Sequence, residues 1–167
     1  GVASSAYQIE GGAFDDGKGA SVWDMFTHQT GKIREEHNGD VACDHYHRYE
    51  EDVELMAELG VKCYRFSISW PRIIPNGIGE VNRAGVDFYN RLIDCLLAHN
   101  ITPIATLFHW DYPYELEKRG AWLNPDSSDW FAYYAKVCAE EFGDRCKVFY
   151  PLNEPQCFLG YGYFDGC

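Results

Sequence analysis

The sequence Val-Lys-Cys-Tyr-Arg-Phe-Ser-Ile-Ser at residues 61–69 predicts a β-strand, because it is a short apolar and aromatic run bounded by Gly60 and Pro71. Similar runs occupy residues 101–108 and 147–153. The strand starts recur about every forty residues, with a helical pattern between them. This rhythm is typical of βαβ units, so we expect an α/β protein with a parallel sheet.

The segments between the strands carry apolar side chains at helical spacing. We expect long helices over residues 46–59, 82–100 and 126–142, ended by Gly60, Asn100 and Gly143, and a short helix over residues 113–119. Residues 1–7 are predicted to be the tail of a first strand. Residues 11–43 are rich in Gly and Asp and predict a long loop with one helical turn around residues 21–26. No shift in composition marks a boundary, so one domain is expected over residues 1–167.

A doubly wound sheet and a barrel share this alternation, so the period alone does not choose between them. The polar residues favour the barrel. Arg65, His109, Asn153 and Glu154 lie in the predicted strands or just beyond them, mostly near C-terminal ends, and the long insertions also follow strands. Functional residues gathered at this rim are characteristic of (β/α)8 barrels. We therefore predict a TIM barrel.

The net charge of −12 argues against two classes of partner. Nucleic-acid-binding proteins need basic surfaces, and anionic membrane surfaces attract basic segments. No run of apolar residues approaches the roughly eighteen needed to span a bilayer. We therefore expect neither nucleic acid nor a membrane as a partner.

Seven cysteines are present, and none forms a Cys-x-x-Cys pair. An odd number without framework spacing is typical of reduced cysteines, which favours a cytoplasmic protein. Cys43, His45 and His47 lie close together, but their spacing fits no zinc motif and no second cluster accompanies them. We predict no metal and no cofactor.

Asn153-Glu154-Pro155 follows the last predicted strand. A carboxyl at the mouth of a buried strand, next to a carboxamide and a rigid turn, can be partly desolvated and so keep its proton near neutral pH. An enzyme that cleaves glycosidic bonds needs such an acid to protonate the departing oxygen. The tripeptide alone is also compatible with a solvated loop acid.

Three more motifs occur in order before this one. They read Ala-Tyr-Gln-Ile-Glu-Gly at 6–11, Tyr-Arg-Phe-Ser-Ile-Ser-Trp-Pro-Arg at 64–72 and Leu-Phe-His-Trp-Asp at 107–111. With Asp-His-Tyr-His-Arg-Tyr at 44–49, Trp-Leu-Asn at 122–124 and Leu-Asn-Glu-Pro at 152–155, the chain resembles glycoside hydrolase family 1, the retaining β-glucosidases and β-galactosidases, over its whole length. The resemblance implies the first four βα units of a (β/α)8 barrel, roughly a third of a family member. We therefore expect the chain to be the N-terminal part of a longer enzyme.

The resemblance also implies roles for individual residues. Glu154 matches the general acid/base, and Asn153 matches the residue that binds the sugar 2-hydroxyl. Gln8 and His109 match residues that bind the glycone hydroxyls, and Trp110 lines the same subsite. An amide that both donates and accepts, like that of Gln8, suits a hydroxyl that does the same.

Arg65 matches the arginine that orients the nucleophilic carboxylate and keeps it ionised. We expect its role to be an ion pair with that carboxylate more than a direct contact with the substrate. Glu10 and Asp111 fit their motifs, and we interpret both as structural.

Two features depart from the family pattern. Its fourth strand commonly reads Trp-x-Thr-x-Asn-Glu-Pro, whereas Phe149 and Pro151 replace the Trp and the Thr here. A proline in a central strand lacks an amide donor, so we expect Pro151 to affect the register of Asn153 and Glu154. The family's nucleophile belongs to an Asn-Gly-flanked Glu motif that has no match here, since Glu36-His37-Asn38-Gly39 lies in the first long loop. We therefore expect the nucleophile to lie outside this chain.

The sequence thus predicts a β-glycosidase, most plausibly a β-glucosidase, with a small β-glycoside or oligosaccharide as its substrate. A 6-phospho-β-glycosidase of the same family is one alternative, which the acidic balance slightly disfavours. A non-catalytic sugar-binding relative is the other. The intact Glu154 argues against that second alternative, whereas Pro151 slightly favours it.

Overall fold

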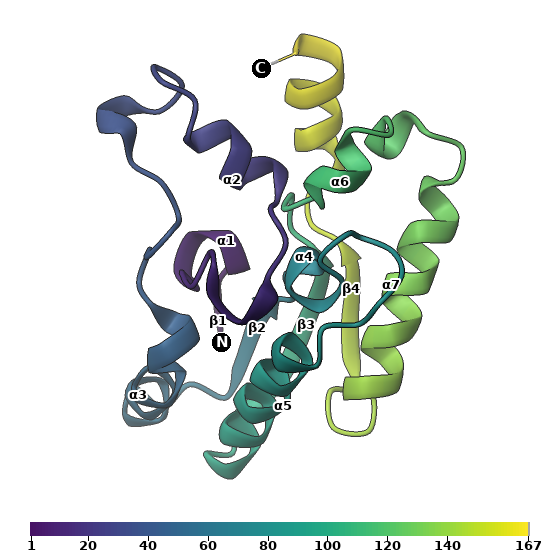
Figure 1. Ribbon diagram of the computed structural model, residues 1–167. Coiled ribbons are helices and arrows are strands. Elements are labelled where there is room, and N and C mark those ends of the chain that lie inside the picture. Colours follow the sequence, from purple (N-terminus) through teal and green to yellow (C-terminus); the bar gives the residue numbers. More distant parts are fainter. Residues whose placement is uncertain (167) are drawn as a thin grey trace.

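The sheet follows the chain in sequence order. The computed structural model describes residues 1–166, so Cys167 lies outside the described residues. Within them, one parallel sheet contains β1 (Val2–Ala3), β2 (Cys63–Ser67), β3 (Thr102–Phe108) and β4 (Val148–Leu152), in the order β1-β2-β3-β4 (Figure 1). A doubly wound sheet reverses its strand order part-way. The uninterrupted order is that of a barrel wall, which confirms the prediction.

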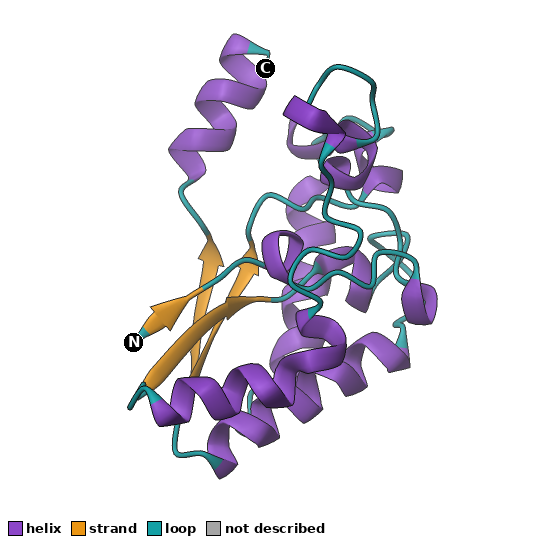
Figure 2. Cartoon of the chain, turned by 90° about the vertical axis from the view of Figure 1, so that its left-hand side faces the viewer, coloured by secondary structure: helices purple, strands orange, loops and turns teal. Residues whose placement is uncertain are grey.

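Long helices connect the strands and lie on one side of the sheet (Figure 2). They are α3 (His45–Glu58), α5 (Arg83–Ala98) and α7 (Ser127–Phe142), and they confirm the three long helices predicted. The shorter helices are α1 (Ala6–Ile9), α2 (Val22–Thr27), α4 (Trp70–Ile73), α6 (Tyr114–Glu117) and α8 (Pro155–Cys157), with 3-10 turns at Asp15–Gly17, Arg34–Glu36 and Ala121–Leu123 and a π-helix at Phe158–Asp165. Within residues 1–166 no helix is long and apolar enough to cross a bilayer.

The two faces of the sheet differ in burial. Tyr64, Phe66 and Ile68 alternate along β2 and the residue after it, and all three are buried in the core against the helices. On the other face, Arg65 is half-buried beside the exposed ring of Tyr150. Alternation along each strand therefore separates a helix-packed core from an open concave side.

Pro151 interrupts the ladder without shifting it. The β3–β4 register pairs Thr106 with Tyr150 and Phe108 with Leu152, and the pair between them, at Pro151, is missing. This is the effect expected of a residue without an amide hydrogen. The register is the same on both sides of the gap, so Asn153 follows β4 in the position that the motif predicts.

The N-terminal segment differs from the prediction. The strand covers only Val2–Ala3, and residues 6–9 form α1. The Ala6 amide donates to Ser67 Oγ (2.7 Å), and the Glu10 amide donates to the Ala6 carbonyl (2.9 Å). These contacts turn the chain away from the sheet. The strand predicted over residues 1–7 therefore ends at Ala3, and Gln8 lies on a helix.

Candidate active site

Asn153 is the centre of the candidate site. It is 7% exposed and directly follows β4. Its backbone amide donates to the Phe108 carbonyl (2.9 Å), which continues the pairing with β3. Its own carbonyl accepts the indole N–H of Trp110 (2.8 Å). The C-terminal ends of two neighbouring strands are thus joined at this residue.

The Asn153 side chain joins two more predicted site residues. Arg65 Nη2 donates to Oδ1 at 3.2 Å, and Nδ2 lies 3.1 Å from His109 Nε2. Since a guanidinium can only donate, Oδ1 must face Arg65 and the amide nitrogen must face His109. His109 Nε2 is therefore an acceptor, which places the imidazole proton on Nδ1. That Nδ1 is buried and has no partner among residues 1–166.

The electrostatic surroundings keep His109 neutral. Burial and the neighbouring Arg65 charge lower the pKa of His109 below its ordinary 6.5, and Glu154 raises it by a smaller amount. A neutral imidazole has one donor and one acceptor. Here the acceptor binds Asn153, and the donor on Nδ1 is buried without a partner among residues 1–166.

Glu154 follows Asn153 in a left-handed conformation, with φ at 42°. This turn directs the chain from β4 into α8. The Glu154 side chain is exposed, and its contact within the described chain is the Cys157 thiol, with Sγ 3.7 Å from Oε2. The partial desolvation expected from the sequence is therefore not provided by residues 1–166. The carboxylate nonetheless lies close enough to His109 to influence its pKa.

Gln8 lies apart from the Asn153 contacts. Its exposed side chain accepts a hydrogen bond from Ser5 Oγ (2.7 Å), and no hydrogen bond within residues 1–166 joins it to Asn153 or His109. The structure therefore brings together Arg65, His109 and Asn153 but does not join Gln8 to them.

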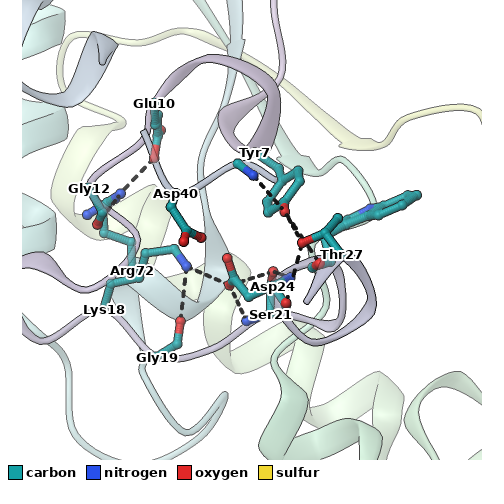
Figure 3. Close-up of polar contacts among 12 residues, drawn as sticks. Tyr7, Glu10, Gly12, Lys18, Gly19, Ser21, Asp24, Thr27, Asp40 and Arg72 are labelled. Carbon is teal, nitrogen blue, oxygen red and sulfur yellow. Dashed lines mark hydrogen bonds and ion pairs between the residues drawn. The ribbon is translucent and has the colours of Figure 1, made fainter. Parts of the chain in front are cut away.

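A buried ionic cluster fixes the end of the helix that carries Gln8 (Figure 3). Glu10, the C-cap of α1, accepts from Arg72 Nε (3.0 Å) and from the Tyr89 hydroxyl (2.5 Å). Arg72 Nη2 also donates to the Gly11 carbonyl (3.0 Å). Both charged side chains are nearly inaccessible, at 1% and 6% exposure. A buried pair with these extra hydrogen bonds is costly to break.

A structural role was predicted for Glu10, which these contacts support, but none was predicted for Arg72 or Tyr89. A signal for Arg72 existed. An arginine directly after a buried strand and the apolar Trp70-Pro71 needs an acidic partner. Tyr89 gave no such signal, because it occupies an ordinary position on the apolar face of α5.

Comparisons with known proteins agree with this geometry. A family model described as Glycosyl hydrolase family 1 matches residues 1–167. The 1,4-beta-D-glucan glucohydrolase of Thermotoga neapolitana is 52% identical over 166 residues, which is 99% of this chain and 39% of that protein. Coniferin beta-glucosidase of Pinus contorta is 54% identical over 167 residues, covering 99% of this chain and 33% of that protein.

The fold is also similar to solved structures. The Thermotoga maritima beta-glucosidase in complex with castanospermine superposes with a TM-score of 0.94 at 52% identity, covering 97% of this chain and 37% of that one. The chain thus spans less than two fifths of the length of these relatives.

Proposed function

Because the chain belongs to glycosyl hydrolase family 1, we propose that the protein containing it hydrolyses terminal β-D-glucosyl bonds with retention of configuration. The observation that carries the proposal is the cluster in which Arg65, His109 and Trp110 all bind Asn153, directly before Glu154. The names of the relatives, beta-glucosidase and glucohydrolase, favour a glucoside without a phosphate group. We propose that residues 1–167 belong to a single (β/α)8 barrel domain.

In this proposal Glu154 is the general acid/base. It protonates the glycosidic oxygen as the leaving group departs, and it later takes a proton from the water that hydrolyses the glycosyl-enzyme. Its exposure within residues 1–166 leaves the carboxyl open to substrate. Desolvation would then come from the bound sugar and from groups outside this chain.

The residues around Asn153 would form the glycone site. The second hydrogen of Asn153 Nδ2 and the second lone pair of Oδ1 remain free to bind the sugar 2-hydroxyl. The half-buried imidazole of His109 borders this site, and Gln8 supplies an amide from α1. Trp110 presents its ring beside them, with its indole N–H already bound to Asn153.

Arg65 is proposed to act on the nucleophile. Its guanidinium binds Asn153 through one nitrogen, and its other donors can pair with a carboxylate at the roughly 5–5.5 Å from Glu154 that retention requires. We place this carboxylate outside residues 1–167, because no Glu in them matches the nucleophile motif. No metal and no cofactor takes part in the proposed reaction.

The test is hydrolysis of an aryl β-glucoside by the protein containing this chain. Glu154→Ala is expected to abolish most turnover, and added azide is expected to restore it, because azide attacks the glycosyl-enzyme without a general base. Glu80→Ala is the matched control, since Glu80 is an exposed acid that makes none of the hydrogen bonds of the Asn153 cluster. Full activity of the Glu154 variant would contradict the assignment.

The isolated 167-residue chain is expected to be inactive. Turnover by the purified chain would show that the nucleophile lies within it and would overturn its placement outside.

A further inference from the structure

Asp111 is a buried carboxyl that the proposed mechanism does not use. It comes directly after His109 and Trp110 and is 2% exposed. It lines a cavity of about 10 Å³, roughly the space of one water molecule. The charged walls of this cavity are Glu10, Lys18, Asp24 and Arg72.

The charges of the other wall residues are already paired. Arg72 binds Glu10 at 3.0 Å, and Lys18 binds Asp24 at 2.8 Å (Figure 3). Neither oxygen of Asp111 has a partner in good hydrogen-bond geometry among the described residues, although the Ser69 hydroxyl lies close enough to lower the pKa of the carboxyl. Asp111 is therefore the carboxyl of this cluster without a cation of its own. An unpaired buried charge is costly, so the neutral form is favoured.

The pKa of Asp111 agrees with this geometry. Burial raises it from 3.8 to about 7, and Glu10 adds to the increase. The Ser69 hydroxyl, the Asp111 backbone amide and Lys18 lower this pKa, each by less than burial raises it. The pKa of His109 is shifted in the opposite direction, because burial disfavours its charged form.

The cavity lies between the segments that carry two proposed sugar-binding residues. Glu10 ends α1, which carries Gln8. On the other side, Trp110 precedes Asp111 with a φ of 77°. Tyr112 follows Asp111, and its carbonyl accepts a hydrogen bond from the Val22 amide at 2.9 Å. A left-handed non-glycine residue persists only where its surroundings hold it. A displacement of Asp111 would therefore be passed through Trp110 to His109, two residues earlier in the chain.

We propose that Asp111 is a positioning residue for the binding of a neutral pyranoside. When neutral, it adds no unpaired charge to the cavity, and the segments carrying Gln8 and His109 stay together around it. When ionised, it is repelled by Glu10, draws in water, and separates those segments. This inference rests on the proposed function, because the ligand is the glucosyl unit.

Protonation and sugar binding are then linked, and each favours the other. An ordinary coupling between two sites changes affinity by about fivefold or more. Sugar affinity should therefore fall by about fivefold as pH rises through the neutral range. Binding near pH 7 should also take up a fraction of a proton.

The test is calorimetric titration of phenyl 1-thio-β-D-glucoside into the protein containing this chain, from about pH 6 to about pH 8. All samples carry Glu154→Gln, which removes the titration of the site carboxyl. Buffers of different ionisation enthalpy report the protons taken up. The comparison variants are Asp111→Asn, which copies the neutral acid, and Lys18→Met, which removes the cation that favours ionised Asp111.

With Asp111 intact, the dissociation constant should rise about fivefold across this range with proton uptake near its midpoint. With Asp111→Asn, the constant should stay at its low-pH value and no proton should be taken up. Lys18→Met should move the midpoint to higher pH, and it provides the test if the Asn variant does not fold. A merely structural Asp111 would not change proton uptake.

The inference is overturned if the Asn variant keeps the pH dependence, if the constant does not change with pH in either protein, or if Lys18→Met leaves the midpoint unchanged. Absence of binding at every pH also overturns it. Hydrolysis of an aryl β-glucoside by the wild type separates these failures from failure of the proposed function.

Discussion

Replacing Tyr89 by Phe removes one oxygen from the buried ionic cluster. The hydroxyl donates to Glu10 Oε1 (2.5 Å) and accepts the Ser69 amide (2.7 Å), and the residue is 0% exposed. A hydrogen bond to a charged group contributes about 1.5–3 kcal/mol, and a buried amide left without an acceptor costs about 1–3 kcal/mol. We therefore expect Tyr89→Phe to lower the free energy of unfolding by about 3–4 kcal/mol. Urea unfolding monitored by tryptophan fluorescence measures this loss.

Tyr134→Phe is the matched control. Tyr134 is equally buried, but its hydroxyl lies against two neutral carbonyls, 2.9 Å from that of Ile68 and 3.0 Å from that of Leu107. One neutral hydrogen bond contributes about 1 kcal/mol. A loss for Tyr89→Phe no larger than that for Tyr134→Phe would refute the claim that the Glu10 carboxylate depends on Tyr89.

Three further results are expected. Burial raises the pKa of Asp111 to about 7 in the folded protein, so its contribution to the free energy of unfolding is complete below about pH 3.8 and is lost as pH rises toward 7. Asp111→Asn removes this pH dependence, so the free energy of unfolding of the variant in urea should exceed that of the wild type by an amount that grows to about 4 kcal/mol, at ~1.4 kcal/mol per pH unit. A difference that does not change with pH would contradict the raised pKa. Asn153→Asp should keep the Arg65 contact but place a carboxylate against His109 Nε2. The pKa of His109, measured by proton NMR titration, should therefore rise by about one pH unit or more. A pKa that stays low would mean that the Asn153 amide does not face the His109 imidazole. Pro151→Thr should change kcat/KM by less than about twofold, because the register is already intact on both sides of the gap. A large gain in kcat/KM would show that Pro151 displaces Glu154.

The strands and long helices could be predicted because their signals are local. Apolar periodicity predicted α3, α5 and α7, and the short apolar runs predicted β2, β3 and β4. The site residues at the ends of β3 and β4 could also be found, since parallel strands bring their C-terminal ends to one rim. Their contacts follow from that topology, because His109 and Asn153 each come just after a strand end.

The parts that were missed depend on contacts between distant residues. Ala6–Ile9 becomes a helix because its first amide binds Ser67, 61 residues away, and no local pattern indicates that contact. Tyr89 and Glu10 are 79 residues apart, so no local pattern in the sequence predicts their hydrogen bond. The exposure of Glu154 was missed because the motif predicts a carboxyl at a strand end but does not indicate which residues cover it.

The four hydrogen bonds of Asn153 also bear on how this protein ages. Asparagine deamidates when the next backbone nitrogen attacks the side-chain carbonyl, which requires both the amide and the backbone to rotate. Arg65, His109, Trp110 and the Phe108 carbonyl prevent both rotations. Asn38, in the exposed loop before Gly39, has no comparable restraint. Stored protein should therefore acquire isoaspartate at position 38 long before the amide at position 153 is lost.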